Sequence, residues 1–280
     1  MRDDDGYITL AVLGFAGLMS AVVIGLIHLT GQGVQRTSIG SQALQIESLL
    51  DSGLTGAGYL LFVENLNPED LNATVLSLGE GSVSIAVIDE AIRVDLNKAT
   101  PPLLSSLFEA AGGTSLDPKA FAERVIDWRD EDDLSSIYGA EKFDYRAAGR
   151  VGMPPNQPFR SVDELRFLHG LNIQDFQRLS PFLTVFSPSS RVLENGASAT
   201  VRAALRKPTV SLTDDNLVDG RGQANEPSGV FRIRLTARTA GGSVGVSEAV
   251  IARRTEASRP FAVLSWSRLH DGPGTRDGKS

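Results

Sequence analysis

The chain has 280 residues, of which 41% are hydrophobic and 22% are charged, and this composition fits one or two folded domains. Its net charge of −7 at pH 7 argues against non-specific nucleic-acid binding, because such binding depends on Lys and Arg contacts to phosphates. The absence of cysteine excludes disulfides and thiolate chemistry, and three scattered histidines (His28, His169 and His270) do not favour a histidine-rich zinc site.

The N-terminal region contains a long apolar segment. Residues Ile8 to Leu29 include no Asp, Glu, Lys or Arg, and a membrane-spanning helix needs roughly 20 such residues. A buried core helix is the alternative, but such helices seldom extend this far without a charge. Beyond Gly31 to Gly33, apolar residues recur at spacings of three and four, which predicts that an amphipathic helix continues to about Phe62.

A secretory signal peptide is the other interpretation of this segment. The apolar core of a signal peptide usually has about 7–15 residues and precedes its cleavage site. Here Gly6 precedes the apolar run, so a cut after Gly6 leaves the hydrophobic helix on the mature chain, beginning at Tyr7.

This arrangement resembles that of the type IV prepilins, whose leaders end in glycine. Pilins usually carry Glu at the fifth mature position, and this chain has Ala11 there. Absence of that Glu is a property of the minor pseudopilin K family of the type II secretion system. A subunit at the tip of a filament has no further neighbour for the carboxylate to pair with, and an unpaired carboxylate in lipid is costly. The leader, Met1 to Asp5, departs from the usual basic pilin leader because it is acidic.

The next region changes from strands to helices. Residues 82–88 alternate as a strand does, residues 91–96 follow as a second strand, and Asp89-Glu90 between them predicts a hairpin. From Asn97 the pattern is helical: helices are expected over 101–108, 118–128, 161–168 and 173–179. Pro101 and Gly112-Gly113 delimit the first of these helices, and Ser161 with Glu164 forms a capping box for the third.

Three phrases in this helical region resemble the pseudopilin K family in order and spacing. The first is Val94 to Ala99, and the third runs from Asn156 to Leu165 and leads to Gly170. The second is the most specific, because Trp128 lies among carboxylates in 126–133 and is followed by Gly139-Ala140-Glu141. Residues 179–185 close the region. The resemblance extends from about Gly6 to Arg268.

The second phrase carries an unusual density of acids. Its carboxylates are those of Asp127, Asp130, Glu131, Asp132, Asp133, Glu141 and Asp144. Hard oxygen ligands suit Ca²⁺, although the glycine and glutamate positions of an EF-hand loop are missing. A solvated acidic loop is the alternative. The resemblance implies Ca²⁺ in this module, and the expected ligands are Asp127, Asp130, Asp132, Asp133 and Glu141, with Trp128 and Phe143 packed rather than bound.

A nucleic-acid interpretation of the same region is not favoured. Asn97-Lys98-Ala99 and the segment from Glu164 to Gly170 look like helix-hairpin-helix elements, which hold a phosphate at helix N-termini. The acidic segment between them would repel a phosphate backbone, so no nucleic-acid partner is expected.

The C-terminal part returns to strands. In 229–240, Val230, Arg232, Arg234, Thr236 and Arg238 alternate with the apolar residues between them, which predicts a half-buried strand. Residues 240–243 form a turn, 244–253 the returning strand and 261–266 the last strand. The arginines of these strands make either an exposed face or a patch that docks on acidic neighbours. Residues 213–228 are expected to be a loop.

The resulting fold class is α+β: a long N-terminal hydrophobic and amphipathic helix packed on an antiparallel pilin-type sheet, with a large inserted all-helical, SAM-like module. The expected parts are a leader (1–6), the transmembrane pilin helix (7–62), the pilin β part (63–96 and 188–268), the helical module (97–187) and a disordered tail (269–280).

The resemblance implies a role in assembly. It predicts a minor pseudopilin at the tip of the type II secretion pseudopilus, anchored by a single span in the bacterial inner membrane with most of the chain in the periplasm. The implied partners are minor pseudopilins I and J, also H and the major pseudopilin, the prepilin peptidase and inner-membrane lipid.

Two other classes of function are less consistent with the sequence. A generic single-pass, calcium-binding periplasmic protein unrelated to secretion is the alternative. An enzyme is not expected, because the sequence lacks P-loop, dinucleotide and H-E-x-x-H motifs, and its acids crowd one loop instead of flanking a cleft.

Overall fold

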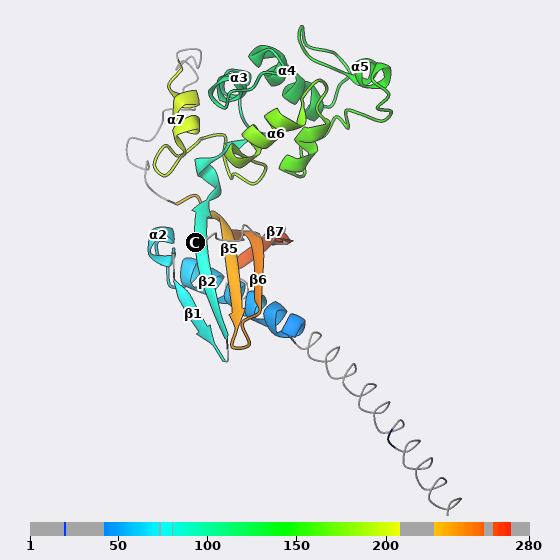
Figure 1. The fold of residues 1–280 in the computed structure, drawn as a ribbon. Helices are drawn as coiled ribbons and strands as arrows, with labels where there is room; N and C mark the ends of the chain where they lie inside the picture. The colour runs from blue at the N-terminus through cyan, green and yellow to red at the C-terminus, as the bar shows by residue number, and fades with distance from the viewer. Residues whose placement is uncertain are drawn as a thin grey trace, which may run out of the picture.

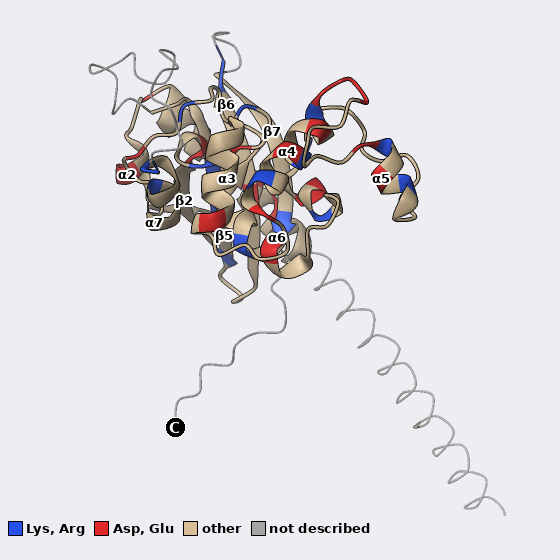
Figure 2. Ribbon diagram, turned by 90° about the horizontal axis from the view of Figure 1, so that it is seen from above, with Lys and Arg blue, Asp and Glu red and all other residues tan. Residues whose placement is uncertain are grey.

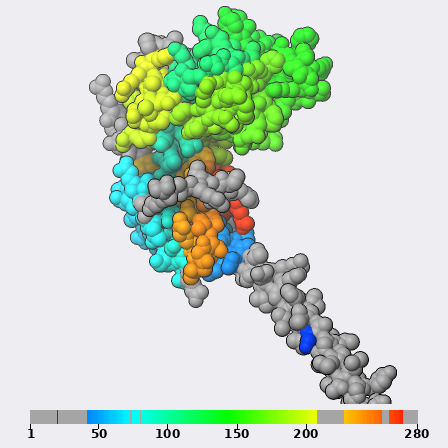
Figure 3. All heavy atoms as spheres, viewed as in Figure 1, coloured from blue at the N-terminus to red at the C-terminus, as the bar shows by residue number. Residues whose placement is uncertain are grey.

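The computed structural model describes residues 20, 42–72, 74–79, 81–207, 227–254 and 260–269. It combines helices with an antiparallel sheet, as the sequence predicts (Figure 1). One helix crosses one face of the sheet, a short helix lies beside the sheet, and the remaining helices form a module at its end (Figure 1). A space-filling view shows this module as a bulky head on the sheet part (Figure 3).

Residues 42–62 are helical and pack on the sheet through one face. The buried side chains of this helix include Leu50, Leu54 and Leu61, which lie at the helical spacing predicted from the sequence. Two glycines bring the helix close: a Cβ on Gly53 would lie 2.7 Å from a methyl carbon of Val83, and one on Gly58 would lie 2.3 Å from the Phe261 ring. The small residues therefore set how near the helix lies to the sheet.

The main sheet has five antiparallel strands in the order β1-β2-β5-β6-β7. The strands are β1 (Val75–Leu78), β2 (Gly81–Asp89), β5 (Val230–Thr239), β6 (Val244–Arg253) and β7 (Phe261–Leu269). A short helix, α2 (Pro68–Leu71), precedes β1. The sequence predicted β2, β5, β6 and β7 but named no strand at β1, whose four residues are half-exposed and carry little pattern.

The face of β5 follows its sequence. Phe231, Ile233, Leu235 and Ala237 are buried against helix 42–62, while Arg234 and Arg238 are exposed. Arg232 differs from the other arginines, because its side chain is only 16% exposed. The predicted alternation is confirmed, and the arginine that departs from it lies at the end of the sheet next to the module.

The predicted strand over 91–96 and its hairpin with 82–88 are wrong. A 3-10 helix, η1 (Glu90–Ile92), follows β2, and only Val94–Asp95 forms a strand, β3. β3 pairs in parallel with β4 (Leu183–Thr184), so its partner comes from the far end of the module. The Asp89 carboxylate accepts a hydrogen bond from the Ala91 amide (2.8 Å), which starts η1 instead of a hairpin turn.

The module contains the four predicted helices and further short helices that were not predicted. Its α-helices are α3 (Pro101–Ala110), α4 (Pro118–Arg129), α5 (Lys142–Ala147) and α6 (Ile173–Leu179), and its 3-10 helices are η2 (Val162–Phe167) and η3 (Ser180–Phe182). Helix α5 was not predicted. The capping box expected at η2 does not form: Ser161 accepts from the Asp163 amide instead of the Glu164 amide, and Glu164 accepts from the Arg160 amide instead of the Ser161 amide.

The boundary expected at residue 187 is wrong. Helix α7 (Ala199–Leu205) belongs to the module, because its buried residues Val201 and Ala204 join the same hydrophobic cluster as Leu104, Phe121 and Trp128. Helix α7 lies against α3 in particular. The module therefore extends from about Val94 to Leu205 instead of ending at residue 187.

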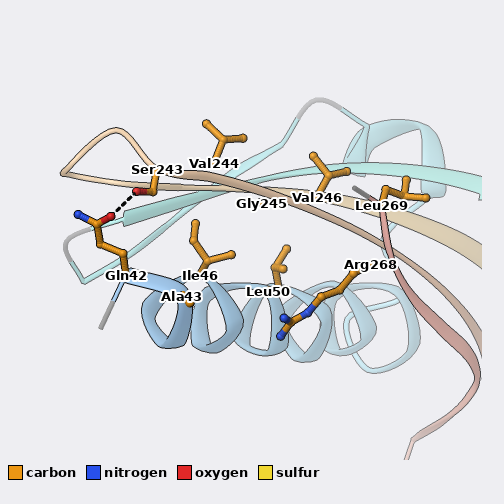
Figure 4. A pocket seen from close by; sticks show the side chains of 10 residues that line it. All are labelled: Gln42, Ala43, Ile46, Leu50, Ser243, Val244, Gly245, Val246, Arg268 and Leu269. Carbon is orange, nitrogen blue, oxygen red and sulfur yellow. Dashed lines mark hydrogen bonds between the residues drawn. The ribbon is translucent and has the colours of Figure 1, made fainter. Parts of the chain in front are cut away.

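A groove opens between the start of helix 42–62 and the β6–β7 edge of the sheet (Figure 4). It has a volume of about 430 Å³. Ile46 faces Gly245 across it, Gln42 and Ser243 are hydrogen-bonded at one end (3.1 Å), and Arg268 lies at the other (Figure 4).

Several expectations concern residues outside the described part. These are the leader, the segment Ile8–Leu29 apart from Ser20, Gly31 to Gly33, the loop 213–226 and the tail beyond Leu269. Among the residues that are described, no helix combines the length and apolar character needed to cross a membrane.

Candidate metal centre

Three of the five expected ligands converge where α4 ends and α5 begins. Asp127 lies in the last turn of α4, Asp130 follows its final residue, and Glu141 immediately precedes α5. Each offers a carboxylate oxygen, and these oxygens all lie within 4.8 Å of one another. Asp127 and Asp130 share a side of the chain because they are three residues apart at a helix end.

Asp127 is held rigidly. Its side chain is fully buried, and it accepts hydrogen bonds from the Ser136 hydroxyl (2.6 Å), the Ser136 amide (3.2 Å) and the Ala140 amide (2.9 Å). A Cβ on Gly139 would lie 1.8 Å from Asp127 Oδ2. The Gly139-Ala140-Glu141 phrase therefore folds back over Asp127 because only glycine fits at its first position.

The other two carboxylates have oxygens with no partner. Asp130 Oδ1 and both oxygens of Glu141 are buried without a hydrogen bond from any described residue. Buried polar atoms are normally satisfied, and an orphaned carboxylate oxygen requires an explanation such as an ion. Two members of the trio, Asp130 and Glu141, thus present carboxylate oxygens that have no hydrogen-bond partner among the described residues.

The electrostatics of the trio agree with this arrangement. Burial, followed by the negative charges of Asp127, Asp130 and Asp133, raises the pKa of Glu141 to about 7. Burial and then the charges of Asp127 and Asp132 also raise the pKa of Asp130. The centre therefore disfavours its own negative charge and would gain from a cation.

Asp132 and Asp133 lie beside this cluster but are not part of it. Both are exposed. Asp132 accepts the Leu134 amide (2.8 Å), and Asp133 forms an ion pair with Lys142 (2.7 Å). The hydrogen bond from Lys142 is the main reason that the pKa of Asp133 is lowered. The acidic loop between α4 and α5 is visible as a run of red in Figure 2.

Asn156 is a residue that sequence reasoning missed. Its side-chain amide donates to the Asp132 carbonyl and to Asp133 Oδ1 (2.9 Å), while its own Oδ1 is buried without a partner among the described residues. Asn156 adopts a positive φ of 49°, which Asn tolerates better than most residues. The only signal was its position at the start of the third phrase, which gives no indication of its contact with the second.

Aromatic side chains form the wall behind the centre. Trp128 is 1% exposed and stacks on Phe159, with ring centroids 5.2 Å apart. Tyr145 from α5 meets Trp128 edge-on at 6.1 Å. Trp128 is packed as predicted, but the same prediction for Phe143 is wrong, because its side chain is 81% exposed.

The expected processing and assembly residues are not part of this geometry. Gly6, Tyr7 and Ala11 lie outside the described residues.

Comparison with known proteins gives one family match. Residues 76–188 match the family model described as type II secretion system (T2SS), protein K. The matched segment contains β3, β4 and the whole carboxylate trio.

Two curated relatives share sequence with part of the chain. Type II secretion system protein K of Klebsiella pneumoniae is 29% identical over 103 residues, which are 37% of this chain and 32% of that protein. Its namesake in Aeromonas hydrophila is 29% identical over 117 residues, 41% of this chain and 35% of the relative. The match spans about a third of the length of these relatives.

One solved structure has the same fold over most of the chain. It is a chain in the crystal structure of the GspK-GspI-GspJ complex from the enterotoxigenic Escherichia coli type 2 secretion system. The TM-score is 0.62 at 17% sequence identity, and the match covers 84% of this chain and 99% of the other.

Proposed function

Starting from the protein K domain of type II secretion that residues 76–188 carry, we propose that this chain is a minor pseudopilin that caps the pseudopilus. The observation that supports this most is the combination of the family match with a likeness in fold, over most of the chain, to a pseudopilin complex. In this role the chain assembles rather than catalyses. The bulky helical head above the sheet would prevent another subunit from stacking on top (Figure 3).

The partners follow from the same proposal. We expect an equimolar complex with pseudopilins I and J, because the solved structure that shares this fold is that of a GspK-GspI-GspJ complex. Pseudopilin H, the major pseudopilin and the prepilin peptidase are further proposed partners. The SAM-like fold expected for the module does not bear on which partners are proposed.

Co-purification tests the function. The full-length chain is co-expressed with candidate I and J pseudopilins and isolated from detergent-solubilised inner membrane. A stoichiometric complex is expected, with an unrelated single-span inner-membrane protein as the control for non-specific association. Absence of a complex, or gold labelling of the chain along the length of filaments instead of one end, would contradict the proposal. If the chain binds neither pseudopilin but still binds calcium, the result would favour the alternative of a generic calcium-binding periplasmic protein.

We propose the membrane anchor as part of the same function. The support is sequence alone: Ile8–Leu29 is long and uncharged, and Gly6 precedes it. Mass spectrometry of the mature chain is expected to find Tyr7 at the N-terminus and the apolar segment retained. A mature N-terminus downstream of Leu29 would remove the proposed bundle, because apolar burial between such helices is what would assemble it.

We also propose that the trio of Asp127, Asp130 and Glu141 holds Ca²⁺. The residues fit the ion, because carboxylate oxygens are its preferred ligands and three of the trio's buried oxygens have no partner among the described residues. When bound, Ca²⁺ would neutralise the carboxylates and tie the end of α4 to the start of α5. Asp132 and Asp133, which lie on the loop beside the trio, would add negative charge near the bound ion.

Titration calorimetry and thermal unfolding of the chelator-treated chain test the calcium site. Added Ca²⁺ should release or absorb heat and raise the melting temperature, since a ligand that binds only the folded state stabilises it. Asp130→Asn should lose both effects, whereas Asp163→Asn, which alters an exposed acid of the same module, should keep them. No heat and no thermal shift in the unaltered chain would remove the site.

A further inference from the structure

The described residues form two hydrophobic cores rather than one. One core lies between helix 42–62 and the sheet and reaches the junction at Val87 and Phe231. The other fills the module and begins at Val94 and Leu183. The segments that cross between them include Glu90 to Val94, which leads from β2 into the module (Figure 1).

A buried carboxylate connects the two parts at this junction. Glu90 is 0% exposed and lies in η1, directly after β2. Its Oε1 accepts a hydrogen bond from Arg232 Nε (2.6 Å), and its Oε2 accepts one from Arg232 Nη2 (3.3 Å). Glu90 and Arg232, which lies on β5 of the sheet, therefore form a bidentate ion pair. The same Oε2 accepts a hydrogen bond from the hydroxyl of Thr184 on β4 of the module.

Further contacts hold both ends of this connection. Arg232 Nη1 donates to Glu248 on β6 (2.5 Å), so the guanidinium bridges two carboxylates. Thr184 is also fully buried, accepts the Phe186 amide (3.0 Å), and its carbonyl receives the Leu96 amide (2.9 Å). Glu90 is therefore in contact with a fixed point in the sheet and a fixed point in the module.

Such a buried pair contributes more to geometry than to net stability. The cost of removing two charges from water offsets most of their attraction, whereas paired hydrogen bonds between a guanidinium and a carboxylate restrict distance and angle together. Apolar contacts alone tolerate sliding because they have no preferred direction.

We propose that Glu90 is a positioning residue that, through Arg232 and Thr184, fixes the orientation of the helical module on the sheet. The two parts then move as one rigid body, although their cores are separate. The inference goes beyond the proposed function, since it holds for the molecule whether or not it caps a filament.

The test is a distance measurement in the full-length chain in detergent. The chain has no cysteine, so Ser77→Cys on β1 and Gln177→Cys on α6, both at exposed positions, place two spin labels on opposite sides of the junction. Pulsed electron paramagnetic resonance should give a narrow distance distribution in the otherwise unaltered chain. Glu90→Gln should broaden it at least twofold, and so should Arg232→Met.

Two further variants separate positioning from stability. Glu90→Gln combined with Arg232→Met leaves no unpaired buried charge at the pair, so thermal stability should recover relative to Arg232→Met alone while the distribution stays broad. Asp163→Asn, which removes an exposed ion pair within the module, should leave the distribution narrow. A narrow distribution in the stable double variant would overturn the proposal, as would broadening by Asp163→Asn. If Arg232→Met does not fold, Glu90→Gln and the double variant give the decisive comparison.

Discussion

Gly139 shows how a single missing side chain shapes the candidate metal centre. Because a Cβ there would lie 1.8 Å from the Asp127 carboxylate, Gly139→Ala should displace the loop or the carboxylate and lower the free energy of unfolding by about 2 kcal/mol. Gly241→Ala is the matched control, since its added carbon would meet nothing closer than 3.8 Å and should change stability by less than about 0.5 kcal/mol. Urea unfolding of the two variants checks the difference, and equal stabilities would contradict the steric argument.

Glu141 should make the ion-free protein less stable as the pH rises. Its pKa is raised from 4.5 to about 7 in the folded state, so between these values the folded state binds more protons than the unfolded state. The free energy of unfolding then falls as the pH increases through this window and levels off above it. Urea unfolding in chelator at pH 5 and pH 7.5 should show this decline. Glu141→Gln should reduce it, and an unchanged slope would assign the decline to other groups.

Part of the candidate metal centre could be predicted from the sequence. Asp127, Asp130 and Glu141 were expected together because acids are dense in this stretch and the family resemblance implies a metal there, and the three do lie together. The directions of Asp132 and Asp133 could not be foreseen, since they depend on Lys142 and on how the chain leaves α4. Asn156 was missed because its contact with the loop bridges 23 positions of sequence.

Helix 42–62 depends on glycine to lie close to the sheet. Gly53→Leu would force a side chain into the space of Val83 and should lower the free energy of unfolding by about 1–3 kcal/mol. Thr55→Leu alters an exposed position of the same helix and should have little effect. Chemical denaturation of both variants tests this, and a tolerated Gly53→Leu would mean that the helix can withdraw from the sheet without loss.

Elements with strong local signals were predicted well, and those set by distant partners were not. Helices α4 and α6 begin after Asp117 and Asn172, whose side chains accept helix amides, and their bounds agree closely with the prediction. Strand β3 has only two residues and depends on β4, far along the chain. Helix α7 lies in a part of the chain that was assigned to the β part, and no local pattern shows that it packs on α3.

Calcium should raise the thermal stability of the module more than that of the sheet core. The chain has two tryptophans, and each lies in a different core region: Trp128 is buried in the module, and Trp266 lies on β7 and packs against the sheet core. In the full-length chain, Ca²⁺ should raise the thermal midpoint reported by Trp128 in a Trp266→Phe variant more than the midpoint reported by Trp266 in a Trp128→Phe variant. Equal shifts would show that the two cores unfold as one cooperative unit.

The pairing of β2 with β5 explains why the sheet can carry so large a head. Asp89 and Phe231 are register partners, and the Ser228 amide donates to Asp89 (2.7 Å), so the module leaves and rejoins the sheet at neighbouring points. In topological terms the module is an oversized loop of a hairpin. Closing a loop costs only about 0.6 kcal/mol more for each doubling of its length, so such a site accepts added chain at little thermodynamic expense. Joining Asp89 to Phe231 through a two-residue Asn-Gly turn keeps this register, and it should accordingly leave a five-stranded meander that still folds on helix 42–62.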